Sequence, residues 1–116
     1  MQGYRVIRVR ASLAGNGCLQ ALEATGHAFR VASGYSPVCA AVTAFLRTAG
    51  ELLGAEKELE VRVSAPEEGS FAMRVGEVPS HRVCRIQGIT DFLLFGIQRL
   101  AEDAPEEVSF IFKEGE

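Results

Sequence analysis

The spacing of apolar residues changes character several times along this 116-residue chain, and these changes restrict the folds open to it. In five segments apolar and polar residues tend to alternate, as on strands, and in two they recur every third or fourth position, as on helices. Strands are expected at 4–12, 18–25, 59–65, 70–75 and 108–112, with helices from Pro37 to a stop at Gly54 and over about 81–102. The order ββαββαβ predicts one α+β domain over 1–116, a two-layer sandwich with a mainly antiparallel sheet and both helices on one face.

The first predicted helix has clear start and stop signals. Ser36 is a good N-cap, and Pro37 suits the first helical position, where its missing N–H costs nothing. Apolar residues follow at positions 38, 42, 45, 46, 49, 52 and 53, which is the stripe of an amphipathic helix. Gly54 is a suitable stop.

The second predicted helix is apolar on more than one side. Its main face consists of Ile86, Ile89, Leu93, Ile97 and Leu100, whereas Phe92, Leu94 and Phe95 fall outside that face. A helix of this kind needs a second partner besides its own core. A homodimer contact is one explanation.

The charge of the chain bears on its partners. A net charge of −3 argues against a protein that wraps nucleic acid, because such proteins usually carry a basic excess. Arg5, Arg8 and Arg10 do not follow a strict period, and we interpret them as the polar positions of a strand. The N-terminus lacks a signal peptide, and no apolar stretch approaches the roughly 20 residues that span a bilayer. We therefore expect a cytoplasmic protein with no membrane and no direct nucleic-acid partner.

The three cysteines are Cys18, Cys39 and Cys84, and no two of them show the C-x-x-C spacing of a zinc or redox site. The sequence thus predicts reduced thiols and neither a metal nor another cofactor. Cys18 is expected to pack at the start of a strand, Cys84 to lie in the core or an interface, and His81 to be solvated.

One segment places a histidine and a cysteine in an order that suits catalysis. His27 follows Gly26 where the second strand ends, and Cys39 falls in the first turn of the helix. The positive end of a helix stabilises a thiolate, and a neighbouring imidazole can protonate a departing amine. The N–H groups of that turn can bind an oxyanion. The alternative on spacing alone is a small buried cysteine and a histidine that caps or fills.

These residues also resemble the signature of a known family. The stretch Gly26-His27-Ala28, then Gly34, then Val38-Cys39-Ala40-Ala41-Val42-Thr43-Ala44 is similar to the motif of the ribosomal-processing cysteine protease family (Prp). That motif is a Gly-His-Ala, a loop ending in Gly, and an Asp-Ile-Val-Cys-Ala-Ala-Val-Ser-Ala-like helix start, with the same interval between His and Cys. The resemblance covers the whole length of the chain.

The resemblance implies a function and a site. It implies a cysteine endopeptidase that removes the short N-terminal extension of a bacterial large-subunit ribosomal protein, with Cys39 as nucleophile and His27 as general acid/base. Gly26 and Gly34 would shape the loop over the cleft, and Ser36 and Thr43 would belong to the neighbouring helix N-terminus. The family is typically homodimeric, so a homodimer is expected here.

Two departures from the family motif keep an alternative open. Ser36 stands where the family usually has Asp, and Pro37 stands where it has Ile. Ser36 carries no charge to stabilise an imidazolium, so a catalytically weakened homologue that binds a ribosomal protein without cutting it is the chief alternative. A third reading, a ribosome factor that contacts RNA, fits the acidic balance poorly.

Overall fold

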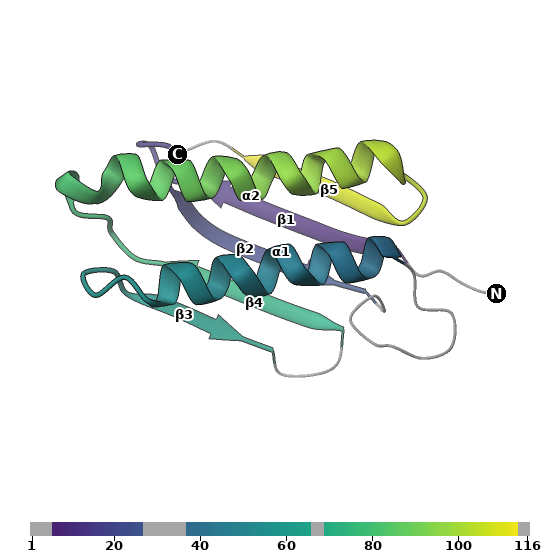
Figure 1. Cartoon of the computed structure of the whole chain (residues 1–116), viewed down its shortest axis with the longest axis horizontal. Helices are drawn as coiled ribbons and strands as arrows, with labels where there is room; N and C mark the ends of the chain where they lie inside the picture. The colour runs from purple at the N-terminus through teal and green to yellow at the C-terminus, as the bar shows by residue number, and fades with distance from the viewer. Residues whose placement is uncertain (1–5, 27–36, 66–68, 114–116) are drawn as a thin grey trace.

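The protein is described here as a computed structural model that covers residues 6–26, 37–65 and 69–113. Within these ranges, two helices cover one face of a five-stranded sheet (Figure 1). The elements are β1 (Ile7–Leu13), β2 (Leu19–Thr25), α1 (Pro37–Gly54), β3 (Val61–Ser64), β4 (Ser70–Val75), a 3-10 turn η2 (Ser80–Arg82), α2 (Val83–Asp103) and β5 (Val108–Lys113). The predicted α+β class and the ββαββαβ order are confirmed.

The sheet has the strand order β3-β4-β2-β1-β5. Neighbouring strands are antiparallel except β1 and β5, which are parallel. A parallel pair needs a crossover connection, and α2 leads the chain back to the edge beside β1. The sheet is therefore mainly antiparallel, as the sequence predicts.

Strict alternation along β1 separates the two faces of the sheet. Ile7, Val9 and Ala11 are buried under the helices, whereas Arg8 and Arg10 are exposed on the other face. The helices meet this apolar layer with their own buried residues, which are Val42, Leu46, Ala49 and Leu53 from α1 and Ile86, Leu93, Leu94 and Ile97 from α2. One core thus lies between the helical layer and the sheet.

The two helices run antiparallel and in contact with each other (Figure 1). The ring of Phe45 on α1 packs directly onto Gly96 of α2, where a Cβ atom would come within 2.5 Å of the ring. Phe92 tilts against the same ring, with the two centroids 5.9 Å apart. Gly96 therefore makes room for an aromatic side chain where the helices approach.

Two details differ from the sequence predictions. Leu94, expected outside the buried face of the second helix, is only 8% exposed. It lies beside Leu13 and Phe110, because β5 enters the sheet next to β1 and brings apolar side chains to that flank of α2. The third strand is shorter than the expected 59–65, since β3 is an edge strand that pairs only with β4.

A group of charged residues joins the segment before β3 to the start of α2. Arg85 Nε donates to Glu56 Oε2 at 2.6 Å, and Arg82 Nε donates to Glu58 Oε1 at 3.0 Å. The hydrogen bond from Arg82 lowers the pKa of Glu58, and His81 adds to this effect. His81 is exposed, as predicted, with Nε2 lying 2.8 Å from Glu58 Oε1. Pairs between exposed side chains contribute little stability, so the Arg82–Glu58 pair orients the connection more than it holds the fold. The side chain of Glu56 is only 10% exposed, so its pair with Arg85 is less screened by water.

Thr90 is the buried polar residue that ties α2 to the sheet. It is 0% exposed, and its Oγ1 accepts a hydrogen bond of 3.0 Å from the backbone N–H of Leu19. Leu19 opens β2 beside an irregularity in the β1–β2 register. The hydroxyl of Thr90 thus provides an acceptor for the Leu19 N–H at the end of the β1–β2 pairing where the register is irregular.

We predict that Thr90→Val destabilises the domain by about 1–3 kcal/mol, because it leaves the buried Leu19 N–H without an acceptor while keeping the side-chain shape. Thr90→Ser keeps the hydroxyl and serves as the matched control, with the smaller loss of one methyl group. Urea unfolding of the three proteins measures the difference. Equal stabilities for Thr90→Val and wild type would show that this hydrogen bond contributes nothing.

Candidate active site

Cys39 is the third residue of α1 and lies in the first turn of the helix. Its side chain is half-buried and packs against the edge of the core. The helix dipole places partial positive charge at this end, which favours an anionic group such as a thiolate. Cys39 is therefore held by a rigid element at the position predicted from the sequence.

Thr43 lies one turn further along α1 and bonds to the backbone of Cys39. Its Oγ1 donates to the Cys39 carbonyl oxygen at 2.8 Å. A threonine that bonds back to the carbonyl four residues earlier occupies its hydroxyl within the helix. Thr43 thus belongs to the surroundings of Cys39, but it acts on the backbone of that turn.

Gly26 ends β2 in a conformation that only glycine adopts without strain. Its φ is +139°, and a Cβ atom there would lie 2.6 Å from the Val6 carbonyl oxygen. Its N–H donates to the Gly69 carbonyl oxygen at 2.9 Å, while a Cβ on Gly69 would lie 2.6 Å from the Gly26 carbonyl oxygen. The two glycines let three backbone segments meet where the chain leaves the sheet toward residue 27.

Gly26 is among the site residues that the sequence predicts, but Gly69 is not. Gly69 follows Pro66, Glu67 and Glu68, a composition typical of a turn. Its pairing with Gly26 depends on β4 running beside β2, with Ser70 opposite Thr25. No local pattern in the sequence could show that neighbourhood.

The end of β2 and the start of α1 lie at the same end of the domain (Figure 1). The structure therefore brings Gly26, Cys39 and Thr43 to one end. The other predicted site residues, His27, Gly34 and Ser36, lie outside the described residues.

The other two cysteines have different surroundings. Cys18 is fully buried, as its predicted packing role requires, and burial raises the pKa of its thiol. Cys84 is exposed on the first turn of α2, so it is not a core residue. Within residues 6–26, 37–65 and 69–113, no group of three or more His, Cys, Asp or Glu side chains could hold a metal ion. No helix in that part of the chain is long and apolar enough to cross a membrane.

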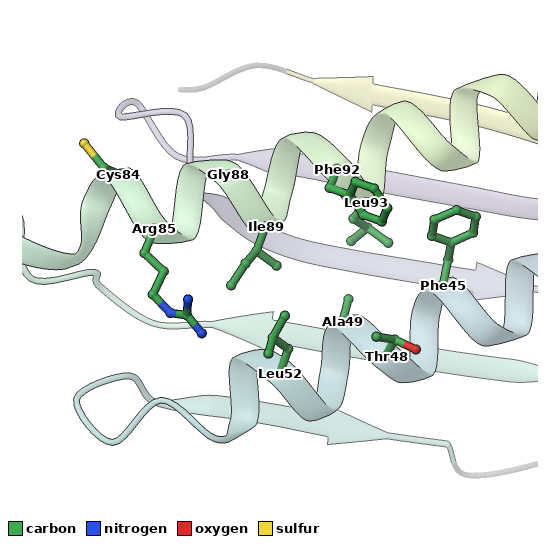
Figure 2. A pocket seen from close by; sticks show the side chains of 10 residues that line it. All are labelled: Phe45, Thr48, Ala49, Leu52, Cys84, Arg85, Gly88, Ile89, Phe92 and Leu93. Carbon is green, nitrogen blue, oxygen red and sulfur yellow. The ribbon is translucent and has the colours of Figure 1, made fainter.

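An apolar groove of about 580 Å³ runs between α1 and α2 on the outer side of the helical layer (Figure 2). Phe45, Ala49 and Leu52 line it from α1, and Ile89 and Phe92 line it from α2. Cys84 stands at one end of the groove with its sulfur pointing away from α1 (Figure 2). Further along α2, Phe95 is 75% exposed and Phe92 is 73% exposed. These rings are large apolar groups in contact with water.

Comparison with known proteins identifies the family of the chain. The family model described as cysteine protease Prp matches residues 6–109. A search of curated proteins gives no match.

Solved structures share the fold over nearly the whole chain. SMU.848 from Streptococcus mutans is 24% identical, with a TM-score of 0.75 over 94% of this chain and 95% of that one. The essential ribosomal processing protease Prp from S. aureus, in complex with a covalently linked product peptide, is 20% identical, with a TM-score of 0.75 over 93% of this chain and 100% of that one. The same protease with a substrate peptide gives a TM-score of 0.73 at 20% identity, with the same coverage. At these identities the likeness shows a common fold. Because the family model spans most of the chain, the protein belongs to the cysteine protease Prp family and is a cysteine protease.

Proposed function

We propose that this protease removes the short N-terminal extension of a bacterial large-subunit ribosomal protein, and that it does so in the cytoplasm. The observation that carries this proposal is the position of Cys39 in the first turn of α1, in a chain that the family model matches over residues 6–109. The resemblance of the motif around Cys39 identifies this residue as the family cysteine. The S. aureus relative is a ribosomal processing protease with a covalently linked product peptide, which supports a covalent step here.

The proposed reaction is acyl transfer through Cys39. The Cys39 thiolate attacks the peptide carbonyl carbon, and the oxyanion that forms accepts hydrogen bonds at the N-terminal end of α1. The intermediate then collapses, the C–N bond breaks, and the departing amine takes a proton from His27. Water next attacks the thioester and gives a proton to His27, which releases the acid and restores the thiolate.

The remaining site residues position these two groups. Gly26 fixes the backbone directly before His27, because it is confined between β1 and Gly69. Thr43 supports the helical turn that carries Cys39. Gly34 and Ser36 complete the loop and the helix start in this proposal. Ser36 supplies no carboxylate to orient His27, so the enzyme works without the charge that the family Asp provides.

We also propose that two copies associate through the exposed apolar side of the helical layer. Phe92, Phe95 and the neighbouring groove leave a continuous apolar strip in water, lined by Phe45 and Leu52 from the other helix. In a two-fold contact each aromatic ring occurs twice, once from each copy, and a fully buried ring removes about 150–250 Å² from water. Burial at about 25 cal/mol per Å² makes this strip a substantial source of association free energy.

The first prediction from this proposed function concerns the two catalytic residues. Cys39→Ala abolishes cleavage of a peptide copying the N-terminal extension from the same genome, and His27→Ala lowers kcat by roughly 10²–10⁴-fold. Cys84→Ala is the matched control, because this exposed cysteine lies at the start of α2, at the end of the domain opposite the start of α1 (Figure 1). Mass spectrometry of the cleaved peptide gives the rates.

Different outcomes separate cleavage from binding. If wild type cuts neither the peptide nor the full ribosomal protein but Ser36→Asp cuts both, the missing carboxylate has cost this chain its activity. Cleavage that survives in Cys39→Ala and stops in Cys84→Ala would contradict the assignment of the nucleophile.

The second prediction concerns Gly26. Gly26→Ala forces an L side chain into a positive φ against the Val6 carbonyl, so we expect a cost of roughly 1–3 kcal/mol and a fall in kcat at temperatures where the protein stays folded. Gly15→Ala is the matched control, because a Cβ there meets nothing within 4 Å. Urea unfolding and peptide cleavage measure the two effects. A stable Gly26→Ala enzyme with wild-type kcat would remove Gly26 from the site.

The third prediction concerns the homodimer. Wild type sediments at twice the chain mass of 12.5 kDa, and Phe92→Glu/Phe95→Glu sediments as a monomer, since charged groups oppose burial of the strip. Ile111→Lys introduces a charge on the sheet side at a position that is 60% exposed, and it should stay dimeric. A monomeric wild type at all concentrations would disprove the proposed contact.

A further inference from the structure

The face of the sheet that the helices leave uncovered has a composition unlike the rest of the chain. Cross-strand partners share a face, so the register defines this surface, which we call the open face. It consists of Arg62 and Ser64 on β3, Ser70, Ala72 and Arg74 on β4, Ala21, Glu23 and Thr25 on β2, Arg8, Arg10 and Ser12 on β1, and Ser109, Ile111 and Lys113 on β5.

The open face is cationic in an acidic protein. Five of its side chains are cationic and Glu23 is the one carboxylate within its paired strands, which gives these residues a charge of +4 although the whole chain has −3. Glu60, directly before β3, lies beside Arg62 and lowers the charge of this surface to +3. The five strands spread these charges over about 19 Å, because neighbouring strands lie about 4.8 Å apart. The register of the sheet thus separates charges that are mixed along the sequence.

The cations of the open face are available for a partner. Arg10 lies opposite Glu23 in the β1–β2 register, yet no ion pair joins them, and none is found for Arg8, Arg74 or Lys113 among the described residues. Arg62 lies 3.8 Å from Glu60, a pair in which both side chains are more than 75% exposed. Arg62 and Arg74 also line a shallow hollow of about 310 Å³, together with Gln20 and Glu60.

The chemistry of the open face favours a nucleic acid over a protein. Protein interfaces have an apolar, aromatic-rich centre, whereas interfaces with nucleic acid are more polar and far more positive. The open face has no aromatic side chain, and Ile111 is its one large apolar residue. Four of its five cations are arginines, whose planar guanidinium groups bind phosphate through two hydrogen bonds.

We propose that the open face binds the phosphate backbone of double-helical RNA. A face without aromatic rings cannot stack bases, as proteins that hold single strands do. A surface of cations and hydroxyls instead suits the wide, shallow minor groove of an RNA duplex, with its phosphates and 2′-hydroxyls. The proposed binding depends only on the charge of this face. If the substrate is a ribosomal protein, as proposed above, the RNA is ribosomal, because such a protein lies close to RNA duplexes; this part rests on the proposed function.

The test measures binding of a labelled RNA hairpin to the full chain by fluorescence anisotropy at several salt concentrations. With about five phosphate contacts, log K should fall with log salt with a slope of about −4.5. Arg10→Ala/Arg74→Ala should weaken binding at least about tenfold and reduce the magnitude of the slope by about 1.8, the share of two contacts. Arg47→Ala/Lys57→Ala, which removes two exposed cations from α1 and the turn after it, should change neither quantity.

A gain of affinity gives a test that unfolding cannot imitate. Glu23→Gln removes the carboxylate opposite Arg10 on the open face and should tighten RNA binding severalfold. Arg10→Ala/Arg74→Ala should still cut the free peptide at the wild-type rate, which separates this proposal from the proposed cleavage.

Several results would overturn the proposal. One is that wild type does not bind the RNA, and another is that Arg10→Ala/Arg74→Ala binds it as tightly as wild type does. The others are that duplex DNA of the same sequence binds as tightly as the RNA, and that polyglutamate or anionic lipid vesicles bind more tightly than the hairpin.

Discussion

The packing of two helices against a single face of the sheet is the contact on which the rest of the molecule depends. Ile7 and Val9 of β1, Leu46 of α1 and Ile97 of α2 are essentially free of solvent, so they form the interior of one core. Burial of these apolar groups is the main favourable term in folding. Because this core is one-sided, the outer side of the helices and the far side of the sheet both remain in water.

The same packing determines where the site lies. β2 ends beside the start of β1 and the start of β4, and Gly26 fits between them because it has no Cβ atom. α1 begins at the same end of the domain, so its first turn presents Cys39 there (Figure 1). A nucleophile on the first turn of a packed helix, as we propose for Cys39, is held more rigidly than one on a loop, and such rigidity favours catalysis. The site therefore depends on backbone geometry as much as on its reactive side chains.

The sequence predicts the elements well because their signals are local. Pro37 and Gly54 mark the two ends of α1 as the structure has them, and the alternation over residues 70–75 gives β4. What the sequence could not predict depends on which strands become neighbours. Leu94 is buried because β5 joins β1, and Gly69 meets Gly26 because β4 joins β2. Strand order is set by long-range contacts, and no short pattern encodes it.

The sequence gives the net charge of the protein, but it does not show how the charges are distributed over the surface. Arg10 and Arg74 are far apart along the chain, but β2 brings them within two strands of each other on the open face. The acidic residues that outnumber them lie elsewhere, for example Glu56 and Glu58 beside α2. A total of −3 therefore does not describe the surface that a polyanion would meet.

The apolar strip on the helices, the end of the domain that carries Cys39 and the open face of the sheet do not overlap. A two-fold contact through the helical layers would leave both sheets on the outside of the dimer, with their open faces directed away from each other. Each Cys39 would remain at the end of its own domain, near the rim of that contact. Such a dimer would hold RNA on one open face and still admit a peptide at either site, because the proposed RNA-binding residues lie on the uncovered face of the sheet, whereas Cys39 lies on α1, which packs on the other face.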